Sequence, residues 1–176
     1  EKIISSIDEL SSLRGTDTVS LVIIEGLANV EVVEKVGDLF GIHQLVLEDI
    51  LNTHQRPKFE EYEDYLYIVL KGMVSTGEQF IVDFEQISLL VLDTIVIAFK
   101  ERKDGLIAPV IQRIRTSKGR FRSLGADFLA YSILDAIIDQ NFVLIDSLDE
   151  AITVLEDELL AGEPGKTLLN RIQRLK

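Results

Sequence analysis

One segment, residues 127–160, constrains the fold of this chain more than any other. It contains nine Asp or Glu residues and no Lys or Arg. Its apolar residues recur at alternating steps of four and three, with Asn141 at the one polar position, and this spacing is typical of a heptad seam on a single helix. The apolar positions are Leu134, Ile138, Ile145, Leu148, Ile152, Leu155 and Leu159. A helix of this length spans about 50 Å. It is therefore expected to project from a globular part or to line an interface.

The residues before this segment alternate between strand-like and helix-like patterns. Helices are predicted over 31–41, where Gly41 suits a C-terminal cap, over 44–52, and over 109–120 from Pro109. Apolar runs of β type cover 18–27, 65–74, 80–92 and 94–100, with a hairpin turn at Asp93 and Thr94. Strands interleaved with helices predict an α/β fold in which helices pack on a mixed sheet. After a break at 161–165, a further helix is predicted to start at Thr167.

Composition narrows the class of protein. The 176 residues are 47% apolar, which is typical of a globular chain with a core. The absence of cysteine excludes disulfides and thiolate metal sites. The net charge of −12 argues against nucleic-acid binding and favours a cationic partner, either metal ions or a basic peptide. We expect no membrane-spanning helix, and we expect the chain to be a piece of a longer protein, because Glu1 is not Met and Lys176 lies within a helical pattern.

Nothing in the sequence predicts an enzyme. His43 and His54 are the only histidines, and neither a G-x-S-x-G nor an H-E-x-x-H motif is present. GEPGKT (162–167) resembles part of a phosphate-binding loop, but the required first glycine is replaced by Leu160 and the stretch follows a helix, not a strand. We expect it to be a turn between helices.

Paired carboxylates are the best candidates for metal ligands. Glu48 and Asp49 are consecutive, so on a helix they point about 100° apart and would face two different sites. Asp135 and Asp139 are one turn apart and could reach one cation or one basic side chain. A solvated acidic surface is the alternative in both cases. The eight Lys or Arg residues of 100–122 form a basic cluster that could bind phosphate or lipid headgroups, or could simply balance the acidic helix.

Four stretches in the same order resemble the CorA family of magnesium channels. They are LFGIHQLVLEDILNTHQRPKFEEYEDYLYIVLK (39–71), EQISLLVL (85–92), PVIQRIRTSKGR (109–120) and GADFLAYSILDAIIDQNFVLIDSLDEAI (125–152). The resemblance implies a cytosolic α/β domain over 1–126, with a mixed sheet sandwiched by helices. It also implies a long acidic helix over 127–160 packed on that domain or projecting from it, and over 161–176 a turn and the start of a truncated stalk helix.

The resemblance also implies an assembly and its place in the cell. Five copies would form a homopentamer on the cytoplasmic side of the cell membrane, with their transmembrane segment missing from this chain. The family's Gly-Met-Asn pore motif is absent, since Gly72 and Met73 are followed by Val74 in a predicted strand.

The resemblance further implies regulatory divalent-cation sites between subunits. Asp49 would be the principal ligand of one site, and Glu48 and Asp135 would belong to a second, while the partnering aspartate would lie beyond Lys176. The expected ion is Mg²⁺, with Co²⁺ or Ni²⁺ also compatible with carboxylate and water ligands. We therefore expect a soluble regulatory domain that senses intracellular Mg²⁺ and gates its uptake. The alternatives are the zinc-transporting branch of the same family, and a soluble scaffold protein whose acidic helix binds a basic partner helix.

Overall fold

The structure, a computed structural model, describes residues 1–76, 82–103, 105–116 and 124–160. Its centre is one five-stranded sheet with the strand order β1-β5-β4-β3-β2. The strands are β1 (Ser20–Glu25), β2 (Lys58–Glu61), β3 (Leu66–Ser75), β4 (Val82–Val91) and β5 (Ile95–Lys100). The pair β1 and β5 is parallel and the other neighbours are antiparallel, so the sheet is mixed, as predicted.

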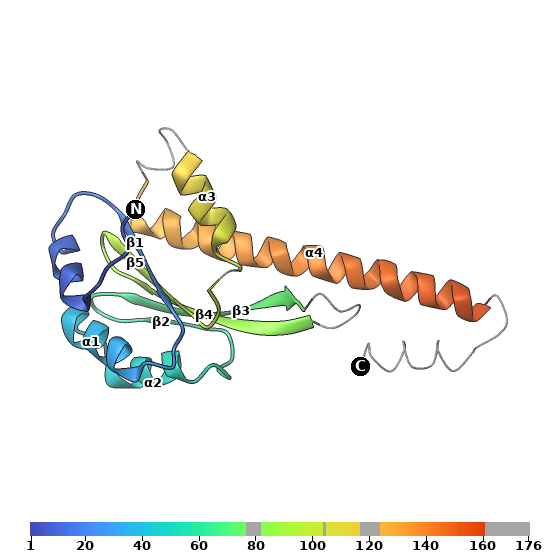
Figure 1. Cartoon of the computed structure of the whole chain (residues 1–176), viewed down its shortest axis with the longest axis horizontal. Coiled ribbons are helices and arrows are strands. Elements are labelled where there is room, and N and C mark those ends of the chain that lie inside the picture. The colour runs from blue at the N-terminus through green and yellow to red at the C-terminus, as the bar shows by residue number, and fades with distance from the viewer. Residues whose placement is uncertain (77–81, 104, 117–123, 161–176) are drawn as a thin grey trace.

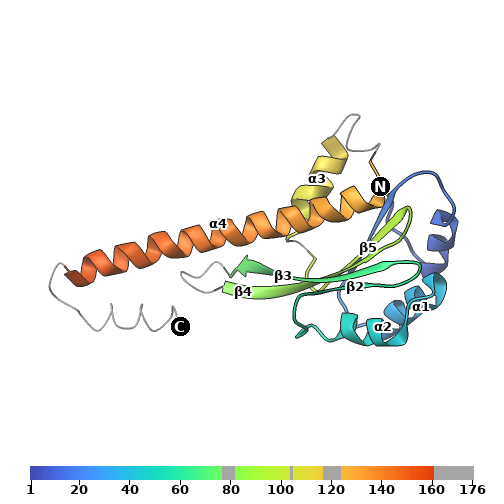
Figure 2. The ribbon, with the colours of Figure 1, turned by 180° about the vertical axis from the view of Figure 1, so that it is seen from behind.

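Helices cover both faces of this sheet (Figures 1 and 2). One face is covered by a 3₁₀ helix, η1 (Ile7–Leu13), and by α1 (Val30–Phe40) and α2 (Gln44–Leu51). The other face is covered by α3 (Ala108–Thr116) and the first half of α4 (Ala126–Leu160). Side chains of successive strand residues enter the two cores alternately: Tyr67 belongs to the first and Ile68 to the second. The predicted α/β fold with a sandwiched mixed sheet is thus confirmed.

The turn between α1 and α2 fixes the position of α2 on the sheet. Gly41 has φ 70° and closes α1 in the left-handed conformation, which only glycine adopts without strain. The Nδ1 atom of His43 then caps α2 by accepting a hydrogen bond from the backbone N–H of Leu45 at 3.2 Å. Gly37 of α1 leaves room for Leu47 of α2, so the two helices pack closely. The predicted cap at Gly41 is confirmed.

The long helix α4 is confirmed, but only part of the predicted seam faces the sheet. Leu129, Ile133 and Ile137 face the sheet and are 6%, 0% and 1% exposed. Of the seam residues, Leu134 packs against the same core and Asn141 bonds to β3, whereas Ile138 and Ile145 are 46% and 44% exposed. The helix therefore rests on the sheet along a stripe that overlaps the predicted seam only in part.

The second half of α4 extends past the end of the sheet (Figure 1). Among the described residues α4 is the one helix long and apolar enough to cross a membrane by length and composition, with an 18-residue window of mean hydropathy 1.5. The sequence led us to expect no such window. Because the first half of α4 forms one layer of the folded unit, length and hydropathy alone do not make it a membrane helix.

Several elements differ from their predicted limits. The strand β2 and the helix η1 were not predicted, and α3 starts at Ala108, one residue before Pro109. The β4–β5 hairpin turn at Asp93 and Thr94 is confirmed, with Leu92 N–H donating to Ile95 O at 2.8 Å. Residues 80–81, 117–120 and 161–176 of the predicted elements, including the helix from Thr167, lie outside the described residues.

Candidate metal centre

The carboxylate of Asp49 lies on the side of α2 that faces the sheet. Its side chain is 26% exposed, whereas Glu48 beside it points to solvent. The two carboxylates therefore serve different surroundings, as expected for consecutive helical positions. Asp49 can take part in a site between α2 and the sheet, and Glu48 can meet only a group that approaches from outside.

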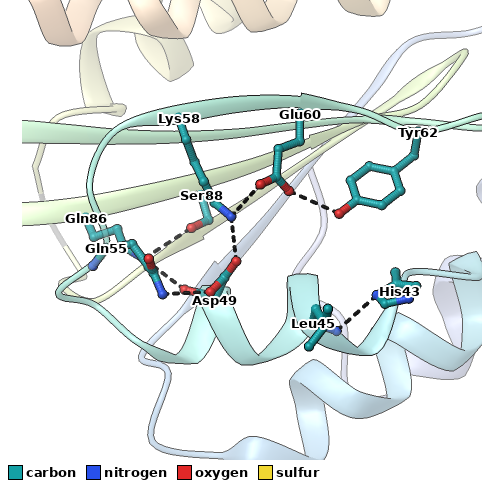
Figure 3. Close-up of polar contacts among 9 residues, drawn as sticks. All are labelled: His43, Leu45, Asp49, Gln55, Lys58, Glu60, Tyr62, Gln86 and Ser88. Atoms are coloured by element: carbon teal, nitrogen blue, oxygen red, sulfur yellow. Dashed lines mark hydrogen bonds and ion pairs between the residues drawn. The ribbon is translucent and has the colours of Figure 1, made fainter.

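Both oxygens of Asp49 already accept hydrogen bonds within the chain (Figure 3). The side-chain amide of Gln55 donates to Oδ1 at 2.6 Å. The ammonium of Lys58 donates to Oδ2 at 2.5 Å and also to Oε1 of Glu60 at 2.8 Å. The lysine thus bridges two carboxylates. Since each carboxylate oxygen can accept two hydrogen bonds, Asp49 keeps free lone pairs for a further ligand.

Strand β2 supplies the groups that surround the lysine. Lys58 and Glu60 are two residues apart on β2, so their side chains leave the same face of the sheet. The hydroxyl of Tyr62 donates to Oε2 of Glu60 at 3.0 Å and holds that carboxylate in place. The hydrogen bond from Lys58 lowers the pKa of Glu60. Partial burial opposes the charge of Lys58, but the hydrogen bonds to Asp49 and Glu60 raise its pKa. Both groups are charged at neutral pH.

The floor of this site comes from the neighbouring strands. Gln86 of β4 is 1% exposed, and its side-chain amide donates to the backbone oxygen of Asp49 at 3.3 Å and accepts from the backbone N–H of Gln55 at 3.2 Å. The ring of Tyr67 on β3 lies 5.2 Å from the Lys58 ammonium, within range of a cation–π interaction. Burial raises the pKa of Tyr67 to about 12, and its hydroxyl has no hydrogen-bond partner of good geometry among the described residues. The groups beneath Asp49 and Lys58 therefore include a buried amide and an aromatic ring.

Asp135, the third predicted ligand, lies elsewhere. It is half-buried on α4, which covers the opposite face of the sheet from α2 (Figure 1). The structure of one chain brings Glu48 and Asp49 onto one helix and separates both from Asp135. Within the described ranges, no group of three or more His, Asp or Glu side chains is arranged to hold a metal ion. Within one chain, the ligands predicted for the second site therefore do not come together.

Sequence reasoning missed the neighbours of Asp49. Lys58 and Glu60 flank Phe59, and this local alternation could have indicated that the two charged side chains share a side of a strand. No comparable signal links Asp49 with Gln86, which lies 37 residues further along the chain. That contact depends on where β4 is placed in the sheet.

With this geometry in place, comparison with known proteins identifies the family. The family described as "CorA-like Mg2+ transporter protein" matches residues 28–176. The chain belongs to this family. It is 40% identical, over 172 residues and 98% of its length, to the cobalt/magnesium transport protein CorA of Thermotoga maritima. It covers 49% of that relative, so it spans about half the length of the transporter it matches. CorA-like proteins are transporters, a class distinct from enzymes.

Solved structures share the fold. The soluble domain of CorA from Methanocaldococcus jannaschii matches with a TM-score of 0.71 and 23% identity, over 90% of this chain and 65% of that one. The ZntB cytoplasmic domain from Vibrio parahaemolyticus matches with a TM-score of 0.64 and 15% identity, over 90% of this chain and 64% of that one. At these identities the likeness shows the fold alone. It does not separate the branches of the family by ion.

Proposed function

We propose that this CorA-family chain is the cytoplasmic, metal-sensing part of a magnesium transporter, and that Asp49 is its principal sensing ligand. The observation that carries the proposal is the position of Asp49, a partly exposed carboxylate on α2 with free lone pairs. Its own ligand atoms are oxygens, the chain contains no cysteine, and hard cations such as Mg²⁺ prefer oxygen. The 40% identity to a cobalt/magnesium transport protein supports the same ion class.

A site with one protein carboxylate needs a second contributor. In the proposed assembly, five copies surround a membrane pore, and each Asp49 faces a neighbouring subunit or a later part of the chain. Glu48 and Asp135 would form a second site in the same way, since they lie on opposite sides of one chain and meet only across an interface. The domain over 1–126, the helix over 127–160 and a stalk beginning within 161–176 would each contribute to that interface.

The charge of the chain explains why metal binding would change the assembly. Five copies at −12 each carry −60, and like charges at close interfaces repel. A dication bound between two carboxylates reduces this repulsion and favours the closely packed assembly. Loss of Mg²⁺ shifts the population toward a looser, open one. Plentiful internal Mg²⁺ would thus shut its own entry route. Mg²⁺ is both the transported substrate and the regulator in this scheme, and Co²⁺ or Ni²⁺ can take its place at the same oxygen ligands.

The test uses the full-length transporter. The variant Asp49→Asn keeps the shape of the side chain and removes its charge, and Asp38→Asn on the exposed side of α1 is a matched control. We expect Asp49→Asn to abolish the Mg²⁺-dependent protection from proteolysis and the shut-off of transport, while Asp38→Asn leaves both unchanged. For the second site, Asp135→Asn is compared with Asp146→Asn, an exposed position further along the same helix. An Asp49→Asn protein that still responds to Mg²⁺ like the wild type would refute the proposal.

A zinc-transporting relative is the second candidate, because the ZntB cytoplasmic domain has the same fold. Zinc prefers nitrogen and sulfur ligands, whereas the ligand atoms that Asp49 itself offers are oxygens. Titration of proteolytic protection with Mg²⁺, Co²⁺ and Zn²⁺ in parallel separates the two. Protection by Zn²⁺ at far lower concentration than by Mg²⁺ would favour the zinc branch.

A further inference from the structure

Lys58 occupies the place where a cation would bind Asp49. Its ammonium lies 2.5 Å from Oδ2, at direct hydrogen-bond distance, and the two side chains are 27% and 26% exposed. A metal ion that coordinates this oxygen directly would lie close to the ammonium, and two positive charges at such separation repel strongly. Direct metal binding at Oδ2 and the present position of Lys58 therefore exclude each other.

The structure also provides a second position for the lysine. Glu60 already accepts a hydrogen bond from the same ammonium at 2.8 Å, and its side chain, 38% exposed, lies on the open side of the site. Tyr62 fixes the Glu60 carboxylate from the other side. The ring of Tyr67 lies beneath the ammonium. Lys58 has a long flexible stem, so it can leave Asp49 and keep both Glu60 and the Tyr67 ring as partners.

We propose that Lys58 is a built-in competitor for the Asp49 carboxylate. It neutralises Asp49 when no dication is bound, and it moves fully onto Glu60 when a hydrated dication such as Mg²⁺ takes Oδ2. This inference rests on the proposed function of Asp49 and adds the residue that sets the affinity of that site. Because metal must displace a tethered cation, the site fills only at high Mg²⁺ concentration, which suits a sensor of an abundant ion.

The competitor also changes what happens when metal leaves. A bare Asp49 would add one uncompensated negative charge to an already acidic interface. Because Lys58 returns to Oδ2 when the metal leaves, the Asp49 carboxylate has a cationic partner in both the metal-free and the metal-bound state. The switch then exchanges the Lys58 ammonium, which belongs to the same chain, for a dication that can bridge two chains. The lysine cannot bridge in this way because its single charge is already bonded to Asp49 and Glu60 of its own chain.

The experiment measures the Mg²⁺ concentration at half-maximal protection from proteolysis in the full-length transporter. Lys58→Met keeps the apolar stem and removes the charge, and Lys35→Met on the exposed side of α1 is the control for the change in net charge. We expect Lys58→Met to lower the midpoint about fivefold, the size typical of a partly exposed ion pair, and Lys35→Met to leave it unchanged. Lys58→Arg retains the competing charge and the fold, and its midpoint should not fall.

A double-mutant cycle separates displacement from a simple effect of charge. Glu60→Gln removes the second position of the lysine, so it should raise the midpoint when Lys58 is present and have little effect in the Lys58→Met background. If Glu60→Gln raises the midpoint equally in both backgrounds, or if Lys58→Met behaves like Lys35→Met, the competitor role is wrong. The proposed function survives either result, provided that Asp49→Asn abolishes the Mg²⁺ response. If Asp49→Asn retains that response, both proposals fall.

Discussion

Asn141 provides the sharpest test of how α4 is held on the sheet. Its side-chain oxygen accepts a hydrogen bond from the backbone N–H of Met73 at 2.7 Å, and its amide nitrogen donates to the backbone oxygen of Lys71 at 3.2 Å. Strand β2 pairs with β3 only as far as Val69, so this edge of β3 has no strand partner among the described residues. One side chain of α4 thus takes the place of a missing strand.

The variant Asn141→Leu removes both bonds and leaves a backbone donor and acceptor partly buried. At about 1 kcal/mol for each bond, and more if the freed groups stay out of water, the free energy of unfolding should fall by about 2–3 kcal/mol. For a chain of this size that corresponds to a decrease in Tm of about 4–12 °C. Asn141→Asp keeps the acceptor for Met73 but places a carboxylate oxygen against the Lys71 carbonyl, so it should also destabilise. Urea unfolding followed by far-UV circular dichroism gives the free energies.

The control is Ser147→Leu, a polar-to-leucine change at an exposed position further along α4. We expect it to alter the free energy of unfolding by less than about 0.5 kcal/mol, as most surface substitutions do. If Asn141→Leu is as stable as Ser147→Leu, then the two hydrogen bonds contribute nothing and the edge of β3 must be satisfied by water. The role assigned to Asn141 would then be wrong.

Three further predictions concern the core and the loops. Gly72→Ala should lower the free energy of unfolding by about 1–3 kcal/mol in urea, because the added Cβ would overlap the buried side chain of Leu106. Gly41→Ala should lower it by about 1 kcal/mol, since φ there is 70°, and Gly41→Asn should recover part of that loss. Burial raises the pKa of Glu85, which is 1% exposed, so the native chain holds this proton more tightly than the unfolded chain. The contribution of Glu85 to the free energy of unfolding is therefore present at low pH and lost as pH rises through the raised pKa. Glu85→Gln should remove this contribution to the pH dependence, which unfolding curves measured from about pH 4 to 8 would show.

The sequence predicted those elements whose residues carry a strong local signal. The apolar runs of β3, β4 and β5 are buried on both faces, and such runs identify strands without knowledge of their partners. Strand β2 has only Phe59 as an apolar residue, and that side chain is 60% exposed. It becomes a strand because β3 is available to pair with it. The intrinsic strand propensity of residues 58–61 was too weak to predict β2.

The candidate site likewise has one part that the local sequence predicts and another that depends on contacts between distant residues. Asp49 was singled out through the family resemblance and its place on a helix, and the structure confirms the helix. The ion pair with Lys58 and the contact with Gln86 were not predicted, since both depend on how α2 docks against the sheet, where Lys58 lies on the edge strand β2 and Gln86 on the central strand β4. Similarly, the heptad pattern of α4 indicated the helix correctly but not the face that contacts the sheet. A wide sheet accepts several neighbouring helix faces, so the pattern does not select one.

The attachment of α4 over only part of its length has a mechanical consequence. Among the described residues, the last hydrogen bonds between α4 and the sheet are those of Asn141, and the 19 residues from there to Leu160 extend about 28 Å further along the helix. A lever of this length converts a tilt of about 5° at the sheet into a displacement of about 2 Å at its tip. Rearrangements at the sheet too small to break a single hydrogen bond would therefore reach the distal end as movements comparable to the size of an atom.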